Sequence, residues 1–416
     1  MRRIARGLLV AFVFAIPWEY SLVLPAPFGN VARLLGLVTL AAALVSVLAS
    51  GQFQTPSSLH WLVLTLYLWW CCTGFWSMDA EVSTVRMRGY FQEMMILWLL
   101  WELAANAADL RLLLRAWVAG SWVLALLTLA SFAAADALAA GQARFFAAGQ
   151  DPNDVARYLN LGLPLAALLF RCERRTALRW IAFAYMPVGL AAVLLTASRS
   201  GFVAAVLALL GCAIVVWSGR AGHFVMTVPA LALLMAGWWL VIPPETLNRL
   251  ATIPGELERG DLNQRVNIWT AGWDAFTHAP ICGSGVGTFA SASHTAPMDT
   301  AHNTLLSIAV TGGLCAVFIG LMILAAVIWR LAHLRGLLRR ALLTCLALWG
   351  VASLTATVEE SRTTWLLLGT IAVAGRLSAE RKQEMEACFE PERGEIREPC
   401  NTGLVSASRY GSRSPV

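Results

Sequence analysis

Three side chains that can bind anions or move protons stand beside long apolar runs: Arg199, Arg265 and His302. A guanidinium offers a rigid fork of donors that fits a phosphate in bidentate fashion, and two arginines match the two phosphates of a lipid pyrophosphate. The imidazole is the side chain suited to proton transfer at neutral pH, and at a helix N-terminus its neutral, accepting form is favoured. The pattern therefore predicts a pyrophosphate site beside a proton acceptor.

Each of these residues also has a plainer structural interpretation, and the sequence leaves both open. Arg199 follows an apolar run, where an arginine can instead reach lipid headgroups. Arg265 lies on an amphipathic segment and could be a solvated surface residue. A lone histidine such as His302 is more often structural than catalytic. His278 and His294 are rivals in the same polar stretch, but neither adjoins the start of a long apolar run.

Three more residues are secondary candidates: Asn303, Arg86 and Arg88. Asn303 directly follows His302. We expect Arg86 and Arg88 on an external loop beside the fourth apolar run, where they add positive charge to the same side or reach the membrane interface. The Asp-Pro-Asn-Asp motif at 151–154 is typical of a helix cap with proline in the first turn.

The elements that must position these residues are membrane helices. Of the 416 residues, 58% are hydrophobic and only 13% are charged, which excludes an ordinary soluble domain. Runs of about 20 apolar residues fit helices that cross a bilayer, and not barrel strands. The predicted fold class is an all-α polytopic membrane protein with twelve spans, near 8–24, 31–49, 59–76, 90–105, 113–134, 155–171, 179–196, 201–218, 224–242, 303–329, 341–357 and 363–377.

Arginines predict the orientation of these spans, because basic residues in short loops stay on the cytoplasmic side. From the fourth span onward, every other loop is basic. This places both termini in the cytoplasm, and it places the 243–302 loop on the other side, the periplasm of a bacterium. The first span follows a basic start but lacks a cleavage pattern, so we expect it to be retained.

Two regions are predicted: a transmembrane domain over 1–377 and a mobile cytoplasmic tail over 378–416. The tail is rich in Glu, Arg, Ser, Pro and Gly, and it has little apolar surface to bury. Inside the 243–302 loop we expect a short helix over 245–259 and an amphipathic helix over 263–277. The second helix could lie on the outer leaflet or pack against the bundle.

Several function classes are excluded by what the sequence lacks. The net charge of +6 reflects cytoplasmic loops and lipid contact, so we expect membrane lipids and no nucleic acid as partners. The glycines at 283–287 lack the spacing of a nucleotide-binding loop and are interpreted as a turn. Metal-ligand spacings are missing too, so a mechanism without metal or cofactor is expected.

The order of these motifs resembles the O-antigen ligase and polymerase superfamily over about residues 60–375. The residues that carry the resemblance are Asp151-Pro152-Asn153, Thr196-Ala197-Ser198-Arg199-Ser200-Gly201, Arg265 with Trp269, Pro280-Ile281-Cys282-Gly283-Ser284-Gly285-Val286-Gly287-Thr288-Phe289, His302-Asn303 and Gly312-Gly313-Leu314.

The resemblance implies a GT-C-like glycosyltransferase of the bacterial inner membrane with a periplasmic active site. It implies transfer of an O-antigen glycan from undecaprenyl pyrophosphate to a sugar hydroxyl of lipid A-core in lipopolysaccharide biosynthesis, with inversion and without metal. Arg199 and Arg265 would bind the pyrophosphate, and His302 would activate the hydroxyl.

Two alternatives stay open. A polymerase of O-antigen or exopolysaccharide, or a protein O-oligosaccharyltransferase, shares this core and differs in the acceptor. The compact 243–302 loop favours a ligase. The second alternative is a lipid-linked glycan transporter, which would need charges inside the spans. Few acidic residues are expected there, chiefly Glu93 and Glu102, which favours an enzyme.

Overall fold

The computed structural model describes residues 1–25, 29–134, 144–216, 242–253, 255, 264–296 and 300–390. Within this part the chain is helical, and its one β pairing is an isolated bridge between Val23 and Asn30. The helices are α1 (Arg2–Ala15), η1 (Ile16–Ser21), α2 (Val31–Ser50), α3 (Ser58–Thr73), η2 (Gly74–Trp76), α4 (Ala80–Leu103), α5 (Ala107–Ala134), α6 (Pro152–Cys172), α7 (Thr176–Leu195), α8 (Arg199–Val216), α10 (Pro244–Ala251), α12 (Arg265–His278), α13 (Phe289–Ser293), α14 (Thr304–His333), α15 (Gly336–Ser353), η4 (Val358–Glu360), α16 (Arg362–Glu380) and α17 (Lys382–Phe389).

The all-α polytopic membrane fold is confirmed. In the described part, eight helices are long and apolar enough to cross a membrane. Three more predicted spans correspond to α3, α4 and α16, of which α3 has 16 residues and the other two carry charged residues. The predicted span at 224–242 lies almost wholly outside the described residues.

Helix α6 lies at the centre of the bundle. In its apolar, membrane-spanning stretch 83% of the residues are buried, against 22% in the corresponding stretch of α2. Small residues let its neighbours approach closely. A Cβ added to Gly162 would stand 2.6 Å from the Tyr185 hydroxyl of α7, and one added to Gly201 of α8 would stand 2.5 Å from Ala156. The Asn160 amide also donates to the Gly201 carbonyl at 2.9 Å. The start of α8 is therefore fixed against α6.

Helix α14 is broken at Gly313, whose φ of 66° and ψ of −170° are not helical. The loop at 280–285 fills the break: the Leu314 amide donates to the Pro280 carbonyl at 2.8 Å, and the Ser284 amide donates to the Val310 carbonyl at 2.9 Å. A Cβ at Gly313 would stand 2.1 Å from the Ile281 carbonyl oxygen, so glycine is required. The first turns of α14 are thereby held as a separate short helix.

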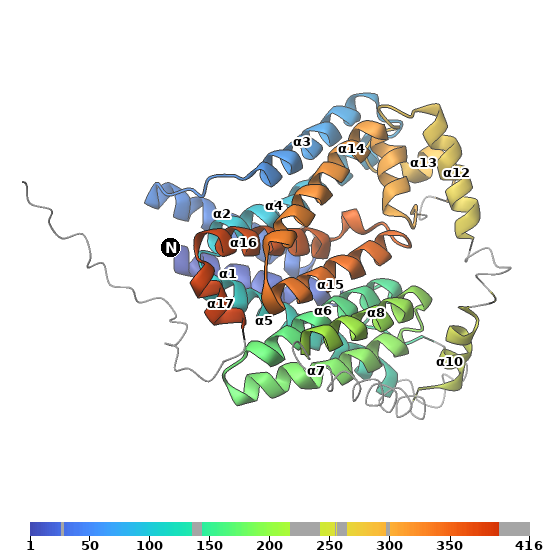
Figure 1. Ribbon diagram of the computed structural model, residues 1–416. Helices are drawn as coiled ribbons and strands as arrows, with labels where there is room; N and C mark the ends of the chain where they lie inside the picture. Colours follow the sequence, from blue (N-terminus) through green and yellow to red (C-terminus); the bar gives the residue numbers. More distant parts are fainter. Residues whose placement is uncertain are drawn as a thin grey trace, which may run out of the picture.

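The segment predicted as one external loop gathers at one end of the bundle, where Figure 1 shows α10, α12 and α13. The N-terminus and α17 lie at the opposite end (Figure 1). The two helices expected in this loop are present as α10 and α12, which overlap the predicted ranges 245–259 and 263–277.

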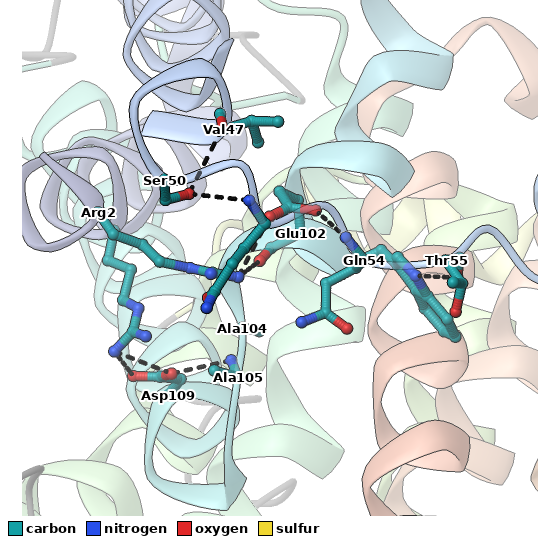
Figure 2. Close-up of polar contacts among 12 residues, drawn as sticks. Arg2, Val47, Ser50, Gln54, Thr55, Glu102, Ala104, Ala105 and Asp109 are labelled. Carbon is teal, nitrogen blue, oxygen red and sulfur yellow. Dashed lines mark hydrogen bonds and ion pairs between the residues drawn. The ribbon is translucent and has the colours of Figure 1, made fainter. Parts of the chain in front are cut away.

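At the end that holds the N-terminus, charged groups form close pairs (Figure 2). Arg2 contacts Glu102 at 3.1 Å, and the Gln54 amide donates to the same carboxylate at 2.9 Å. Arg6 contacts Asp109 at 3.4 Å. Glu102 is the second-to-last residue of α4, so the expectation of a charge inside the span is wrong for this residue.

The predicted tail needs a correction at its start. Residues 378–380 complete α16, and α17 follows with Met385, Cys388 and Phe389 buried. The Cys172 thiol donates to the Phe389 carbonyl at 3.0 Å, which joins α17 to the end of α6. Ordered structure therefore extends to at least residue 390. The rest of the predicted tail, 391–416, lies outside the described residues.

Candidate active site at the α8 and α14 helix starts

Arg199 is the first residue of α8, directly after a tight turn. Ala197 in this turn is fully buried and has a φ of 49°, a left-handed conformation that is uncommon for alanine. The Ser198 hydroxyl accepts from the Gly201 amide at 3.1 Å, which caps α8, and donates to the Asn153 side chain at 2.8 Å. Arg199 is thus carried on a turn held rigidly against the start of α6.

Two arginines that the sequence analysis did not single out surround the same turn. Arg249 of α10 donates to the Ala197 carbonyl at 3.3 Å, and Arg199 donates to the Arg249 carbonyl at 3.5 Å. Arg144 donates to the Thr196 carbonyl at 3.1 Å. Three guanidinium groups from separate segments therefore meet at the turn before α8, and this end of the bundle is here called the rim.

The electrostatics of Arg144 show how close this cluster is. Burial lowers its pKa, the positive charges of Arg249 and Arg199 lower it further, and Asp151 opposes the shift. Like charges held this near repel one another, and the binding of an anion relieves the repulsion. The cluster is therefore suited to a multiply charged anion such as a pyrophosphate.

Arg265 opens α12, after Gln264 in a left-handed conformation with φ of 65°. Burial lowers the pKa of Arg265, and the Asp151 carboxylate opposes that shift. Asp151 caps α6 by accepting from the Asn153 amide at 2.7 Å, as the sequence predicted. Because Arg144 also interacts with Asp151, this carboxylate is the common neighbour of Arg265 and the arginine cluster.

His302 stands just before α14 and also has a left-handed conformation, with φ of 46°. Such a conformation in a residue other than glycine costs on the order of 1–3 kcal/mol and is found most often at functional sites. Its Nδ1 lies 3.5 Å from the Thr300 hydroxyl, and the ring interacts electrostatically with Asp154 of α6. Asp154 in turn forms an ion pair with Arg157 at 3.1 Å.

The predicted site residues Arg199, Arg265 and His302 therefore lie around the start of α6. Each of them is linked to a different residue of that start. Arg199 adjoins the turn bonded to Asn153, and Arg265 interacts with Asp151. His302 interacts with Asp154.

Each secondary candidate lies in or directly before a helix. Asn303 caps α14, because its side chain accepts from the Leu306 amide at 3.0 Å. The prediction of an external loop for Arg86 and Arg88 is wrong, because α4 already starts at Ala80. Arg86 forms an ion pair with Glu360 at 2.8 Å. Arg88 is exposed, two residues along the helix and on a different face.

Two carboxylates near the start of α14 were also overlooked as site residues. Glu359 and Glu360 form η4, and Glu359 is buried with 7% exposure. Burial, and then the neighbouring Glu360, raise the pKa of Glu359 to about 8, while nearby hydroxyls of Ser307 and Thr304 oppose the shift. Thr304 ties η4 to α14, since its hydroxyl accepts from the Val358 amide at 3.0 Å.

An apolar cleft between α6, α8 and α15, here named the α6–α8 cleft, begins at the same rim. Its empty volume is about 430 Å³, including its open side. Asn153, Arg157 and Ser200 line its polar end, and Leu161 and Leu348 line its apolar wall.

These features define a polytopic membrane protein whose arginine-rich rim stands above an apolar cleft. Residues 184–321 match the family model described as O-antigen ligase. The match includes Arg199, Arg265 and His302, and over this part of the chain it supports the resemblance that the motifs predicted. No curated protein matches the chain. A family match of this kind supports a membrane enzyme of the glycosyltransferase type.

Proposed function

We propose that this protein transfers an O-antigen glycan from undecaprenyl pyrophosphate to a sugar hydroxyl of lipid A-core. The observation that carries the proposal is the cluster of Arg144, Arg199 and Arg249 at the start of α8. Asn153 and Ser200, which adjoin this cluster, line the α6–α8 cleft, and His302 interacts with Asp154 at the same end of α6. A charged pyrophosphate head and a long isoprenoid tail match this combination of a cationic rim and an apolar cleft.

The arginines and the histidine would act at opposite sides of the sugar carbon that reacts. The bond between that carbon and the pyrophosphate oxygen breaks, and the electron pair stays on the pyrophosphate. Fixed guanidinium groups stabilise the charge that develops there. The acceptor oxygen forms the new bond from the opposite face, which inverts the configuration, and His302 takes the hydroxyl proton as general base.

The site is proposed to face the periplasm of the bacterial inner membrane, with both termini in the cytoplasm. Support comes from the positions of α10, α12 and α13 at one end and of the N-terminus and α17 at the other (Figure 1). The basic loops predict that the second end is cytoplasmic. No metal is proposed, because the arginines supply positive charge at the leaving group.

Purified protein in EDTA, given a glycan on undecaprenyl pyrophosphate and lipid A-core, tests this proposal. Wild type should label lipid A-core, and His302→Ala, Arg199→Ala and Arg265→Ala should each lose transfer. His278→Ala is the matched control, because His278 is exposed at the other end of α12.

The acceptor decides between the related activities. Lengthened glycan on the donor without labelled lipid A-core would identify a polymerase, and labelled protein would identify a protein O-oligosaccharyltransferase. An intact donor carried across the membrane without bond cleavage would identify a transporter and contradict the proposal.

A further inference from the structure

A second apolar cleft lies between α1, α2 and α4, and is here named the α2–α4 cleft. Its empty volume is about 360 Å³, including its open side. Phe12, Leu40 and Leu99 contribute to its apolar wall, whereas Arg33 and Arg362 stand at its polar end. It shares no lining residue with the α6–α8 cleft.

The polar and apolar parts of this cleft are arranged along α2. Arg33 lies in the first turn of that helix, and Gly36, Leu37 and Leu40 follow it along the cleft. Seven residues of helix from Arg33 to Leu40 span about 10 Å, most of one leaflet's depth. The order of charge and apolar surface matches a lipid with an anionic head at Arg33 and one acyl chain against the wall.

The two arginines of the cleft differ in how their charge is balanced. Arg362 forms an ion pair with Glu19, a carboxylate that is 1% exposed and that also accepts from the Asn30 amide at 3.4 Å. Arg33 is exposed, and among the described residues its guanidinium has no ion-pair partner. Arg33 is therefore the positive charge that a phosphate at the cleft mouth would meet.

Neighbouring polar residues link the ends of the two clefts. Arg362 lines the α2–α4 cleft, and the residue before it in sequence is Ser361. The Ser361 hydroxyl lies 3.3 Å from the Tyr158 hydroxyl. Tyr158 follows Arg157, which lines the α6–α8 cleft. Two apolar clefts with polar ends therefore lie close to the start of α6, where His302 and the arginines lie.

We propose that the α2–α4 cleft holds an acyl chain of the lipid acceptor, with Arg33 bound to one of its phosphates. This inference rests on the proposed function. A reaction between two lipid-anchored substrates needs two membrane sites that meet at one centre. The acceptor hydroxyl is separated from the lipid phosphates by the core sugars, so the phosphate site must lie away from His302.

Crosslinking tests binding without any transfer. Lipid A-core with a diazirine on one acyl chain is added to the full chain in phosphatidylethanolamine nanodiscs, without donor. The expected products are peptides of α2 and α4 that line the cleft. Labelling elsewhere, or labelling that is abolished when phosphatidylglycerol is included, would overturn the inference, the latter by showing an ordinary phospholipid site.

Kinetics then separate this inference from the proposed function. Arg33→Gln and Leu37→Trp should each raise the KM for lipid A-core about tenfold while leaving the donor KM unchanged. Leu44→Trp is the matched control, because Leu44 is exposed on the same helix outside the cleft. Normal transfer with an unchanged acceptor KM in both variants would overturn the acceptor site and leave the transferase intact. Acceptor labelling without any transfer would instead overturn the proposed function.

Discussion

Arg2 at one end of the bundle and Arg144 and Arg249 at the other are held in different ways. At the end with the N-terminus, Arg2 meets the carboxylate of Glu102 at 3.1 Å (Figure 2). At the other end, Arg144 and Arg249 donate to backbone carbonyls of the turn at 196–197. A carboxylate balances the charge of a guanidinium, whereas a backbone carbonyl fixes its position. The first kind of contact contributes to stability, and under the proposed function the second holds guanidinium groups where a pyrophosphate would bind.

Strained backbone conformations also differ between the two ends of the bundle. In the described part, the left-handed residues other than glycine are Ala197, Gln264, His294 and His302, and all lie in the α8 turn or the segment around α12 and α14. Strain of this kind persists only where the surrounding structure enforces it, and it gathers at functional sites.

The largest expected effect comes from removing the charge at the start of α8. Arg199→Ala should lower the rate of transfer by about 10²–10³, because a fixed donor at the developing charge is lost. Single-turnover transfer to lipid A-core measures this rate. A rate within a factor of three of wild type would remove Arg199 from the site and undermine the comparison between the two ends.

A smaller effect is expected at an arginine that sequence did not reveal. Arg144→Gln should raise the donor KM about tenfold, since one charged hydrogen bond to the pyrophosphate is lost. Steady-state kinetics at saturating acceptor measure this value. Arg115→Gln is the control arginine, because Arg115 is bound to Glu173 at 2.6 Å near the other end of α6. Equal donor KM values for the two variants would contradict the prediction.

The opposite end should respond in stability and not in turnover. Glu102→Gln should lower the free energy of unfolding by about 1 kcal/mol, because Arg2 loses its charged partner. Thermal unfolding in detergent measures the loss, and transfer per folded molecule should stay at the wild-type value. A changed donor KM in this variant would show that the two ends are not separate in function.

A further prediction concerns the pH dependence of stability. The pKa of Glu359 is raised from 4.5 to about 8, so between these values the folded protein holds a proton that the unfolded chain has released. Stability should therefore fall as pH rises from about 4.5 to about 8. Glu359→Gln should flatten this part of the curve of melting temperature against pH. A wild-type curve that rises over the same range would contradict the buried, protonated state.

Much of the fold could be predicted from apolar run length, since a bilayer permits few alternatives to a helix. The errors occurred at helix ends. Arg86 and Arg88 were expected on an external loop before the span at 90–105, although Asp79 accepts from the Val82 amide at 3.0 Å and caps α4. An acidic residue before a helix, followed by Glu81 in the first turn, is a capping signal that could have placed Arg86 inside the helix.

The site could be predicted only where a motif marked a helix start. Arg199 and His302 adjoin such starts, and both lie beside α6 in the structure. Arg144 and Arg249 belong to segments without a motif, more than 40 residues away from Arg199 in sequence, and only folding brings them to the same turn. Contacts between distant segments leave no local pattern to detect.

The central claim is that the rim arginines bind a pyrophosphate on a lipid, and the affinity for undecaprenyl pyrophosphate without a glycan tests it most directly. The protein in nanodiscs would be titrated with this lipid as wild type, Arg199→Ala and Arg2→Ala. The account predicts binding at least about tenfold weaker for Arg199→Ala and unchanged for Arg2→Ala. Equal affinities for all three proteins would contradict it.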